Sequence, residues 1–364
     1  MAGPLLAYYR YLTASGMLVL GATGLYLGDI WNWLGVAAFI VALTFDVTTP
    51  RDEAERKTTN GRLENLVLYL PLPLIVLIWL LLGPQLGGTN EISLHTLGAA
   101  LSVAFLSALG GLPPSHELMH RRNRFDRFYA SLYLTIFLLP MSDLGHVQGH
   151  HLNVATADDY DTPRRGQTVY TFAFRSLWYQ MLDSIEMERR RLQKLQLPLW
   201  SPPGRFFQAV LTVSVWLFVL FATAGIEFVV PYIATMLVFY LVLGGFNYTQ
   251  HYGLLREVGE PIAARHSWNQ LKPLSRALSF EISNHSEHHL VPTKPYTSLT
   301  PQPNGPQLPS IILCFFAAFI PPIWERYIAK PNLELWDRYF ADDRERQLAL
   351  TANEHAGWEN WLEK

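Results

Sequence analysis

The chain has 364 residues, of which half are hydrophobic and only 16% are charged, a balance too apolar for an ordinary soluble domain of this length. Its formal charge is −2 and its basic residues lie in separate groups, which excludes the broad positive field of a nucleic-acid-binding protein. A single cysteine, Cys314, excludes an intrachain disulfide and a four-thiolate iron–sulfur cluster. Flavin, nicotinamide and P-loop signatures are also absent, so electrons for any redox chemistry must come from another protein.

Six uncharged apolar runs have about the length of membrane-spanning helices, because a bilayer core of about 30 Å needs roughly 20 residues of helix. They cover residues 11–28, 30–45, 66–82, 96–115, 206–226 and 228–250, the second being short for a span. The N-terminus lacks the features of a cleaved signal peptide, so the first run is expected to be a retained helix. The predicted fold is therefore all-α: a polytopic membrane protein with six transmembrane helices and a cytoplasmic helical cap that carries a metal site.

The placement of lysine and arginine predicts the orientation of these spans. If the N-terminus is cytoplasmic, the exterior loops are residues 29, 83–95 and 227, and none of the 28 Lys and Arg residues falls in them. Cytoplasmic loops retain positive charge, so we expect a protein of the inner, cytoplasmic membrane with both termini and the active site on the cytoplasmic side. A seventh apolar run, residues 308–324, contains two adjacent prolines that break a helix, and we interpret it as a re-entrant or interfacial segment.

The spans divide the chain into four parts. Residues 1–115 contain transmembrane helices 1 to 4, and the first histidine motif begins directly afterwards. Residues 116–205 form a cytoplasmic insert with two histidine motifs. Residues 206–250 contain helices 5 and 6, and residues 251–364 form a cytoplasmic tail with the remaining histidines. The insert and the tail should meet as a cap beneath the membrane.

Histidine is concentrated in three short windows of the sequence. The windows total 16 residues, where the average density of 12 histidines in the chain would place about half a histidine. The clustered residues are His116, His120, His146, His150, His151, His285, His288 and His289. Many of them are three or four positions apart, so their rings can share one face of a helix. Converging imidazoles form a nitrogen-rich site suited to iron, copper, zinc or nickel.

A ninth histidine, His251, directly follows the sixth predicted span. Nine ligands are too many for one metal, whereas two metals with four or five nitrogens each would leave open positions for dioxygen. Isolated histidines are more often surface or core residues than ligands, and we apply that interpretation to His95, His266 and His355.

Carboxylates near the histidines are candidates for a supporting role, because a ligating histidine usually donates its second N–H to such a group. A solvated acidic loop is an equally good interpretation of any one of them. The candidates ranked highest are Asp158, Asp159 and Glu281, among a set that also includes Glu117, Asp143, Asp161 and Glu287.

Four segments together resemble a known family. They are HELMHRR at 116–122, GHVQGHH at 145–151, NYTQHYGL at 247–254 and NHSEHH at 284–289. In this order they resemble the histidine motifs of integral-membrane di-iron alkane hydroxylases and xylene monooxygenases. DTP at 161–163 and IAKP at 328–331 look closer to the xylene monooxygenase hydroxylase component, whereas VAT at 154–156 looks closer to alkane hydroxylases.

The resemblance implies a non-haem centre of two iron ions, held by the nine histidines, that hydroxylates a methyl group of a small hydrocarbon with O2. Electrons from NADH would arrive through a separate ferredoxin and a flavin-containing reductase, and the hydrocarbon would enter from the membrane lipid. A benzylic methyl of the xylene, toluene or cymene type is the first choice of substrate, with terminal hydroxylation of medium-chain alkanes as the alternative.

Three rival functions remain at this stage. The run from His116 to His120 satisfies H-E-x-x-H, so an intramembrane zinc protease with Glu117 as general base is possible, although it would leave most of the histidines without a role. A fatty-acyl desaturase or hydroxylase would use similar iron chemistry on a lipid. A metal transporter would need ionisable groups inside the spans, and the predicted spans have none.

Overall fold

The structure is a computed structural model that describes residues 8–56, 61–86 and 93–363. Within these ranges all regular secondary structure is helical, and one isolated β-bridge joins Asn269 to Gln307. The predicted all-α class is therefore confirmed. The N-terminal seven residues and residues 87–92, part of one predicted exterior loop, lie outside the described residues.

Five helical segments are long and apolar enough to cross a membrane, and each corresponds to one predicted span. These segments are Asp29–Thr48, Gly61–Leu86, Leu94–Met119, Arg205–Ala224 and Ile226–His251. They are built from helices α3 (Leu34–Thr48), α4 (Gly61–Tyr69), α5 (Pro71–Leu86), α6 (Leu94–Met119), α11 (Arg205–Ala224) and α12 (Val229–His251).

The first predicted span forms a shorter helix than expected. A 3₁₀ turn, Arg10–Leu12, leads into α2, Thr13–Leu27, which has 15 residues. A helix of that length is about 22 Å long, less than the bilayer core. Gly28 ends α2 with φ of 74°, and Gly225 ends α11 with φ of 77°, a conformation that glycine adopts without strain and that lets the chain turn directly into the next helix.

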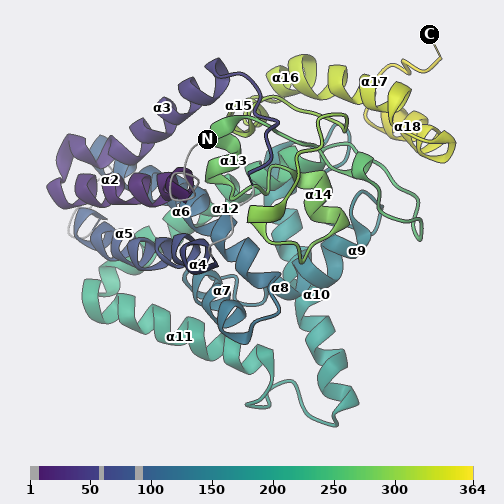
Figure 1. Ribbon diagram of the computed structural model, residues 1–364. Helices are drawn as coiled ribbons and strands as arrows, with labels where there is room; N and C mark the ends of the chain where they lie inside the picture. Colours follow the sequence, from purple (N-terminus) through teal and green to yellow (C-terminus); the bar gives the residue numbers. More distant parts are fainter. Residues whose placement is uncertain (1–7, 57–60, 87–92, 364) are drawn as a thin grey trace.

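Helix α6 lies at the centre of the molecule and carries the first histidine motif at its end. It contacts α2, α3, α5, α7 (Arg124–Ile136) and α12 (Figure 1). Small residues allow these neighbours to approach closely, as is common where helices pack in a membrane. A Cβ on Gly111, for example, would lie 2.5 Å from the ring of Phe137. The central helix therefore fixes His116 and His120 relative to the rest of the bundle.

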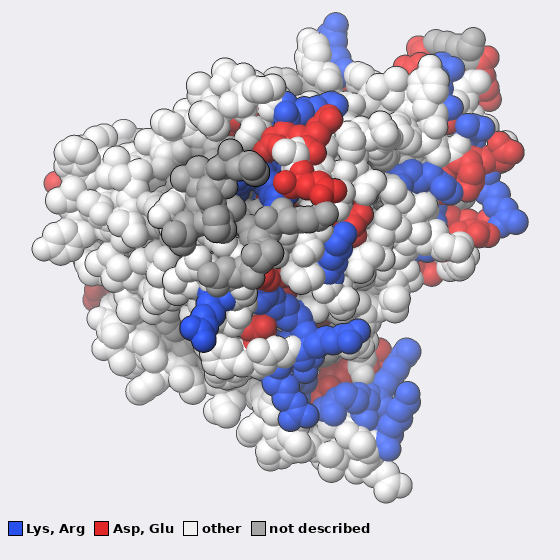
Figure 2. Space-filling model, viewed as in Figure 1, with Lys and Arg blue, Asp and Glu red and all other residues white. Residues whose placement is uncertain are grey.

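The outer surface of the bundle is apolar. Helix α11 exposes Leu211, Val215 and Phe218 to between 52% and 66%, which is expected of a helix that faces lipid rather than water. Figure 2 shows few charges over α2, α5 and α11, whereas Lys, Arg, Asp and Glu gather over α10, α17 and α18. An uncharged surface on one part of the molecule and a charged surface on the other is the distribution of a membrane protein with a polar cap.

The remaining helices belong to the insert and the tail. In chain order they are α8 (Ser142–Gly145), a π-helical turn (His146–His150), α9 (His151–Asn153), α10 (Val169–Lys194), α13 (Pro273–Leu278), α14 (His285–Leu290), α15 (Ile311–Ala318), α16 (Pro321–Trp324), a second π-helical turn (Glu325–Ala329), α17 (Lys330–Tyr339) and α18 (Asp343–His355). Helix α10 packs along α12, and it also contacts α8.

The apolar run at 308–324 is interrupted where its two prolines predict an interruption. Helix α15 ends at Ala318, and α16 begins at Pro321 after Ile320, whose backbone is not helical. Neither piece has the length of a membrane span. The first piece is buried against α3 and α12, with Phe315 stacked on Phe246 at 4.7 Å between ring centroids.

A buried ion pair attaches the C-terminal helices to the insert between α6 and α11. Arg165 donates two hydrogen bonds to the carboxylate of Asp337, at 2.6 and 2.7 Å, and both side chains are fully buried. The same guanidinium donates to the backbone oxygen of Gly253 and to the side chain of Asn353. Arg165 thus joins the loop after the second histidine motif to the end of α12, to α17 and to α18.

Candidate metal centre

The nine histidines come from four separate segments and converge on one region. His116 and His120 lie at the end of α6, and His251 is the last residue of α12. The π-helical turn with α9 carries three more histidines, and α14 carries the last three. A π turn is wider than an α-helical turn and occurs often at functional sites. All nine side chains are buried or half-buried.

The ring nitrogens form two groups. In each group, every residue offers one ring nitrogen that lies within 4.8 Å of those of the other members. The first group is His116, His120, His146, His151 and His288. The second group is His150, His251 and His289. His285 adjoins the second group, because its Nε2 lies 2.8 Å from Nε2 of His251 and 3.2 Å from Nε2 of His289.

Neighbouring histidines in the sequence are therefore divided between the groups. His151 approaches Nε2 of His146 at 3.1 Å, whereas His150 turns toward His251 and His289. Likewise, Nε2 of His288 lies 3.2 Å from Nε2 of His151 in the first group, while His289 belongs to the second. The two groups are in direct contact, because the rings of His151 and His289 stack at 4.4 Å between centroids.

Hydrogen bonds fix the opposite ring nitrogens of His150, His251 and His285, whereas Nδ1 of His289 has no hydrogen-bond partner among the described residues. Nδ1 of His150 donates to Asp159 at 2.8 Å, Nδ1 of His251 donates to the backbone oxygen of His266 at 3.1 Å, and Nδ1 of His285 donates to the backbone oxygen of Ile282 at 3.1 Å. Such bonds place the proton on Nδ1 and leave Nε2 as the free ligand atom.

Burial favours the neutral form of most of these rings, which is the form that binds a metal. Burial lowers the pKa of His120 and of His285 to about 3, so both are neutral at physiological pH. Burial also lowers the pKa of His150, but the charge and hydrogen bond of Asp159 outweigh it, and the pKa of His150 is raised. A metal binds the neutral imidazole, and a carboxylate on the far nitrogen strengthens the ligand.

The donor set fits a pair of transition-metal ions. Five contacts between Nε2 atoms are only 2.8 to 3.2 Å long. The buried Nε2 of His120 has no hydrogen-bond partner among the described residues. A buried polar atom without a hydrogen-bond partner destabilises the folded state. The same holds for several adjacent imidazoles whose Nε2 atoms cannot all be paired as one donor and one acceptor. A cation within each group would satisfy these nitrogens, and imidazole is a good ligand for iron.

The three carboxylates ranked highest from the sequence occupy different places. Asp159 accepts the hydrogen bond from His150 and also bonds Thr162. Asp158 is exposed, and its backbone N–H donates to Thr156 rather than to a histidine. Glu281 lies in a buried ionic cluster, where it accepts hydrogen bonds from Arg276 at 2.6 Å and from Asn284 at 3.0 Å.

Asp161 was named among the carboxylates near the histidines but not among the three ranked highest, yet it lies closer to the histidines than Asp158 or Glu281. One of its oxygens lies within 4.8 Å of ring nitrogens of both His146 and His150. Burial raises the pKa of Asp161. Its place in an acidic stretch, D-D-Y-D, was the available signal, but the sequence does not distinguish a buried carboxylate from a solvated one.

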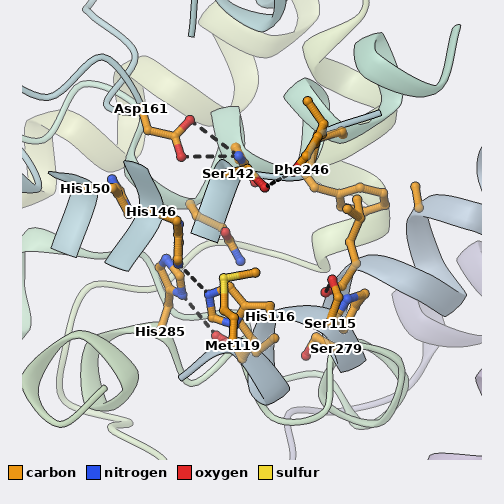
Figure 3. A pocket seen from close by; sticks show the side chains of 18 of the residues that line it. Ser115, His116, Met119, Ser142, His146, His150, Asp161, Phe246, Ser279 and His285 are labelled. Atoms are coloured by element: carbon orange, nitrogen blue, oxygen red, sulfur yellow. Dashed lines mark hydrogen bonds between the residues drawn. The ribbon is translucent and has the colours of Figure 1, made fainter. Parts of the chain in front are cut away.

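A cavity of about 130 Å³ reaches both groups of histidines. Its apolar wall comes from α6, α12 and α15, and includes Leu109, Leu112, Leu243, Phe246 and Ile311. At the metal end it is lined by His116, His146, His150, His251 and His285, with Asp161 beside His146 and His150 (Figure 3). A mostly apolar cavity that ends at convergent metal ligands is the usual form of a site for a small apolar substrate.

The isolated histidines lie away from this centre. The side chain of His266 is buried and bonds Glu345 at 2.6 Å, so it is a core residue in the cap. The backbone oxygen of His95 accepts a hydrogen bond from Asn32 at the opposite end of α6 from the histidine motif. Glu117 bonds Arg121 at 3.2 Å and does not line the cavity, so its position does not suit the general base of a zinc protease.

Comparisons with known proteins identify the family. The fatty acid desaturase family model matches residues 92–302, which include all nine histidines. The xylene/toluene monooxygenase hydroxylase component of Pseudomonas putida is 37% identical over 357 residues, covering 97% of this chain and 96% of its own length. The chain belongs to the family of integral-membrane, histidine-rich hydrocarbon monooxygenases.

Alkane monooxygenases are further relatives within this family. The alkane 1-monooxygenase of Ectopseudomonas oleovorans is 30% identical over 316 residues, covering 84% of this chain and 77% of its own length. Alkane 1-monooxygenase 1 of Alcanivorax borkumensis is 30% identical over 316 residues, covering 84% and 76%. The expected oxygenase activity and membrane location are thus confirmed, and the histidine groups fit the iron centre of such an enzyme.

Proposed function

We propose that this chain is the hydroxylase component of a di-iron monooxygenase that converts a benzylic methyl group of an alkylbenzene to an alcohol. The balanced reaction is R–CH3 + O2 + NADH + H⁺ → R–CH2OH + H2O + NAD⁺. The observation that carries the substrate class is the cavity of about 130 Å³ that ends at the histidines. An apolar cavity of roughly 150 Å³ is enough to hold one benzene ring.

The nine histidines are the proposed metal ligands, five in the first group and four, with His285, in the second. Bound iron would supply the activation of dioxygen. The protein's own contribution is to hold the ligands, to exclude water and to direct one methyl group of the substrate at the histidine end of the cavity. Leu109, Leu243 and Phe246 provide the apolar surface that would hold the aromatic ring.

The electrons are proposed to come from NADH through a flavin-containing reductase and a ferredoxin. The relative from Pseudomonas putida is named as a hydroxylase component, which supports a separate electron-transfer partner. The chain itself has one cysteine and no nicotinamide or flavin signature, so it has no means of its own to take hydride from NADH. Omission of either partner protein from a reconstituted system should abolish product formation.

Six membrane spans with a cytoplasmic cap are the proposed topology, in the cytoplasmic membrane. The first span in chain order, which is not among the five long helical segments, is α2 with its preceding turn, and tilting or local thinning of the bilayer would accommodate its length. The 308–324 segment is proposed to be re-entrant or interfacial. Reporter fusions test this arrangement: fusions after residues 29 and 227 should report the periplasm, and fusions after residues 56, 200 and 363 the cytoplasm.

Product analysis tests the proposed reaction. Membranes that contain this chain, a ferredoxin and its reductase would receive p-xylene, p-cymene and octane together with NADH and O2. Benzyl-type alcohols are the expected products. Octanol as the main product would assign the chain to terminal alkane hydroxylation, which the similarity to alkane 1-monooxygenases supports. A double bond in a lipid, with no alcohol from any hydrocarbon, would assign it to the desaturases and overturn the proposal.

A further inference from the structure

Helix α10 carries a row of large apolar side chains that remain exposed in the folded chain. This row, the α10 stripe, consists of Tyr170, Phe174, Trp178, Met181 and Leu182, which are between 41% and 57% exposed. Spacings of three and four residues place them on one face of the helix. The one charged residue in 169–182 is Arg175, whose guanidinium lies over the rings of Tyr160 and Tyr179, outside the stripe. A contiguous apolar row of this kind marks an interaction surface.

The first turns of α10 are held beside the end of span α12. The ring of Phe172 lies 5.7 Å from the ring of Tyr248, between centroids. Ala173 packs so closely against Gly244 that no Cβ would fit on the glycine. Gly244 precedes His251, the last residue of α12, by seven residues, which is about 10 Å along the helix. The start of α10 is therefore level with the last two turns of this span.

The second half of α10 is held at the start of span α11. A carboxylate oxygen of Glu188 accepts a hydrogen bond at 2.7 Å from the backbone N–H of Arg205, the first residue of α11. In the proposed topology, α12 ends and α11 begins on the same, cytoplasmic side of the membrane. A single helix held at both points runs along that surface of the membrane, and Figure 1 shows α10 lying across the direction of α11.

The apolar surface continues beyond both ends of the stripe. The hydroxyl of Tyr170 donates a hydrogen bond at 2.7 Å to the backbone oxygen of Phe319, at the end of α15. Ile320 and Ile323, in the segment that we propose to be re-entrant or interfacial, are 51% and 42% exposed. In the loop before α11, Trp200 is 60% exposed. Tryptophan and tyrosine are enriched where a membrane meets water.

The second half of α10 is polar. Seven of the residues 183–194 are charged, and the side chain of Arg190 is 72% exposed. Figure 2 shows blue and red side chains over this part of the helix. Helix α10 is accordingly not among the five helical segments that could cross a membrane. A helix with one apolar face and a strongly charged remainder is typical of helices that lie in the plane of the membrane interface.

We propose that α10 is such an interfacial helix and that the α10 stripe inserts among the acyl chains of the cytoplasmic leaflet. This inference rests on the proposed topology, in which α11 and α12 span the bilayer. It places part of the 116–205 insert in contact with lipid, whereas the sequence indicated a wholly cytoplasmic insert. Leu177 and Gln180 of the same helix line the cavity, so α10 forms a wall between the lipid and the substrate site.

Spin labels at single cysteines test whether the stripe meets lipid or water. The three stripe variants are Phe174→Cys, Trp178→Cys and Met181→Cys. Each full-length variant would be labelled with a nitroxide and reconstituted in vesicles of phosphatidylcholine and phosphatidylglycerol. The readouts are collision rates with O2, which concentrates in lipid, and with a water-soluble nickel chelate. The native Cys314 is buried and stays in place, and labelling of the unchanged protein is the blank.

Two further labelled positions serve as references. Arg190→Cys is the matched control on the charged part of the same helix, and Phe218→Cys marks the exposed apolar surface of α11, where Phe218 is 66% exposed. The ratio of O2 to nickel collisions should be several-fold higher at all three stripe positions than at Arg190→Cys, and similar to that at Phe218→Cys. Because the three substitutions are independent, two positions still decide the test if one variant does not fold.

Two results would overturn the proposal while leaving the topology intact. Frequent nickel collisions at the stripe positions would show that the stripe faces water. Rare collisions with both reagents would show that protein covers it, such as a second copy of the chain. Frequent nickel collisions at Phe218→Cys would instead overturn the proposed topology itself.

Discussion

The hydrogen bond between Asp159 and His150 predicts how one of the two proposed metal sites can be weakened selectively. Nδ1 of His150 donates to Asp159 at 2.8 Å, and both side chains are more than nine-tenths buried. In Asp159→Asn the amide oxygen can still accept this bond, but it carries no charge. A hydrogen bond to a charged group contributes about 1.5–3 kcal/mol and a neutral one about 0.5–1.5 kcal/mol.

The expected loss is therefore about 1–2 kcal/mol, or roughly 5- to 30-fold in metal affinity. Mutation of a residue that hydrogen-bonds a metal-bound histidine typically lowers metal affinity or activity by about 10- to 100-fold, a range that overlaps this estimate. The loss should fall on one ion only, because His150 belongs to the second histidine group and the first group has no contact with Asp159.

A chelator competition titration measures this difference. Wild type, Asp159→Asn and the exposed control Asp158→Asn would be titrated with ferrous iron, and each curve would be fitted with two sites. We expect one site to weaken in Asp159→Asn and both to be unchanged in the control. Equal weakening of both sites, or an affinity within twofold of wild type, would refute the assignment of Asp159 to the second group.

Three further outcomes are expected. Ala108→Leu, which narrows the cavity, should lower turnover of p-cymene several-fold more than turnover of toluene, measured as kcat/KM for each substrate. Asp337→Ala leaves Arg165 buried without its partner and should destabilise the cap by about 3–5 kcal/mol, seen as a lower thermal unfolding midpoint in detergent. His251→Ala should abolish hydroxylation while membrane insertion persists, whereas His95→Ala should keep nearly full activity, measured in the same membranes with immunodetection of both variants.

The predictions from sequence were strongest where local chain geometry decides the structure. Long uncharged runs gave five of the six expected spans, because length and hydrophobicity alone determine whether a helix can cross a bilayer. The run 11–28 differed, since the α-helix there begins only at Thr13 after a 3₁₀ turn. The break at Pro321 was also predictable, because proline cannot continue a helix in the middle of its hydrogen-bond ladder.

The metal centre was predictable as a set of residues but not as an arrangement. Clustering, with spacings of three or four residues that place histidines on common helix faces, was sufficient to nominate eight of them. His251 was added from its position directly after the sixth predicted span and from the family resemblance. Spacing did not show that the π turn sends His146 and His150 to different groups, because a π turn depends on tertiary packing rather than on a sequence period. It also did not distinguish buried Asp161 from exposed Asp158, three residues apart in one acidic stretch.

The sequence by itself therefore determined the helical membrane class, the ligand type and the family, because these follow from local hydrophobicity and from motifs within single segments. Only the tertiary structure decided which histidines share a group, which carboxylate faces them and how large the cavity is. Those properties arise where α6, α12, α14 and the turn at His146 meet. Residues more than 100 positions apart in the sequence come into contact there, and no local sequence pattern encodes that packing.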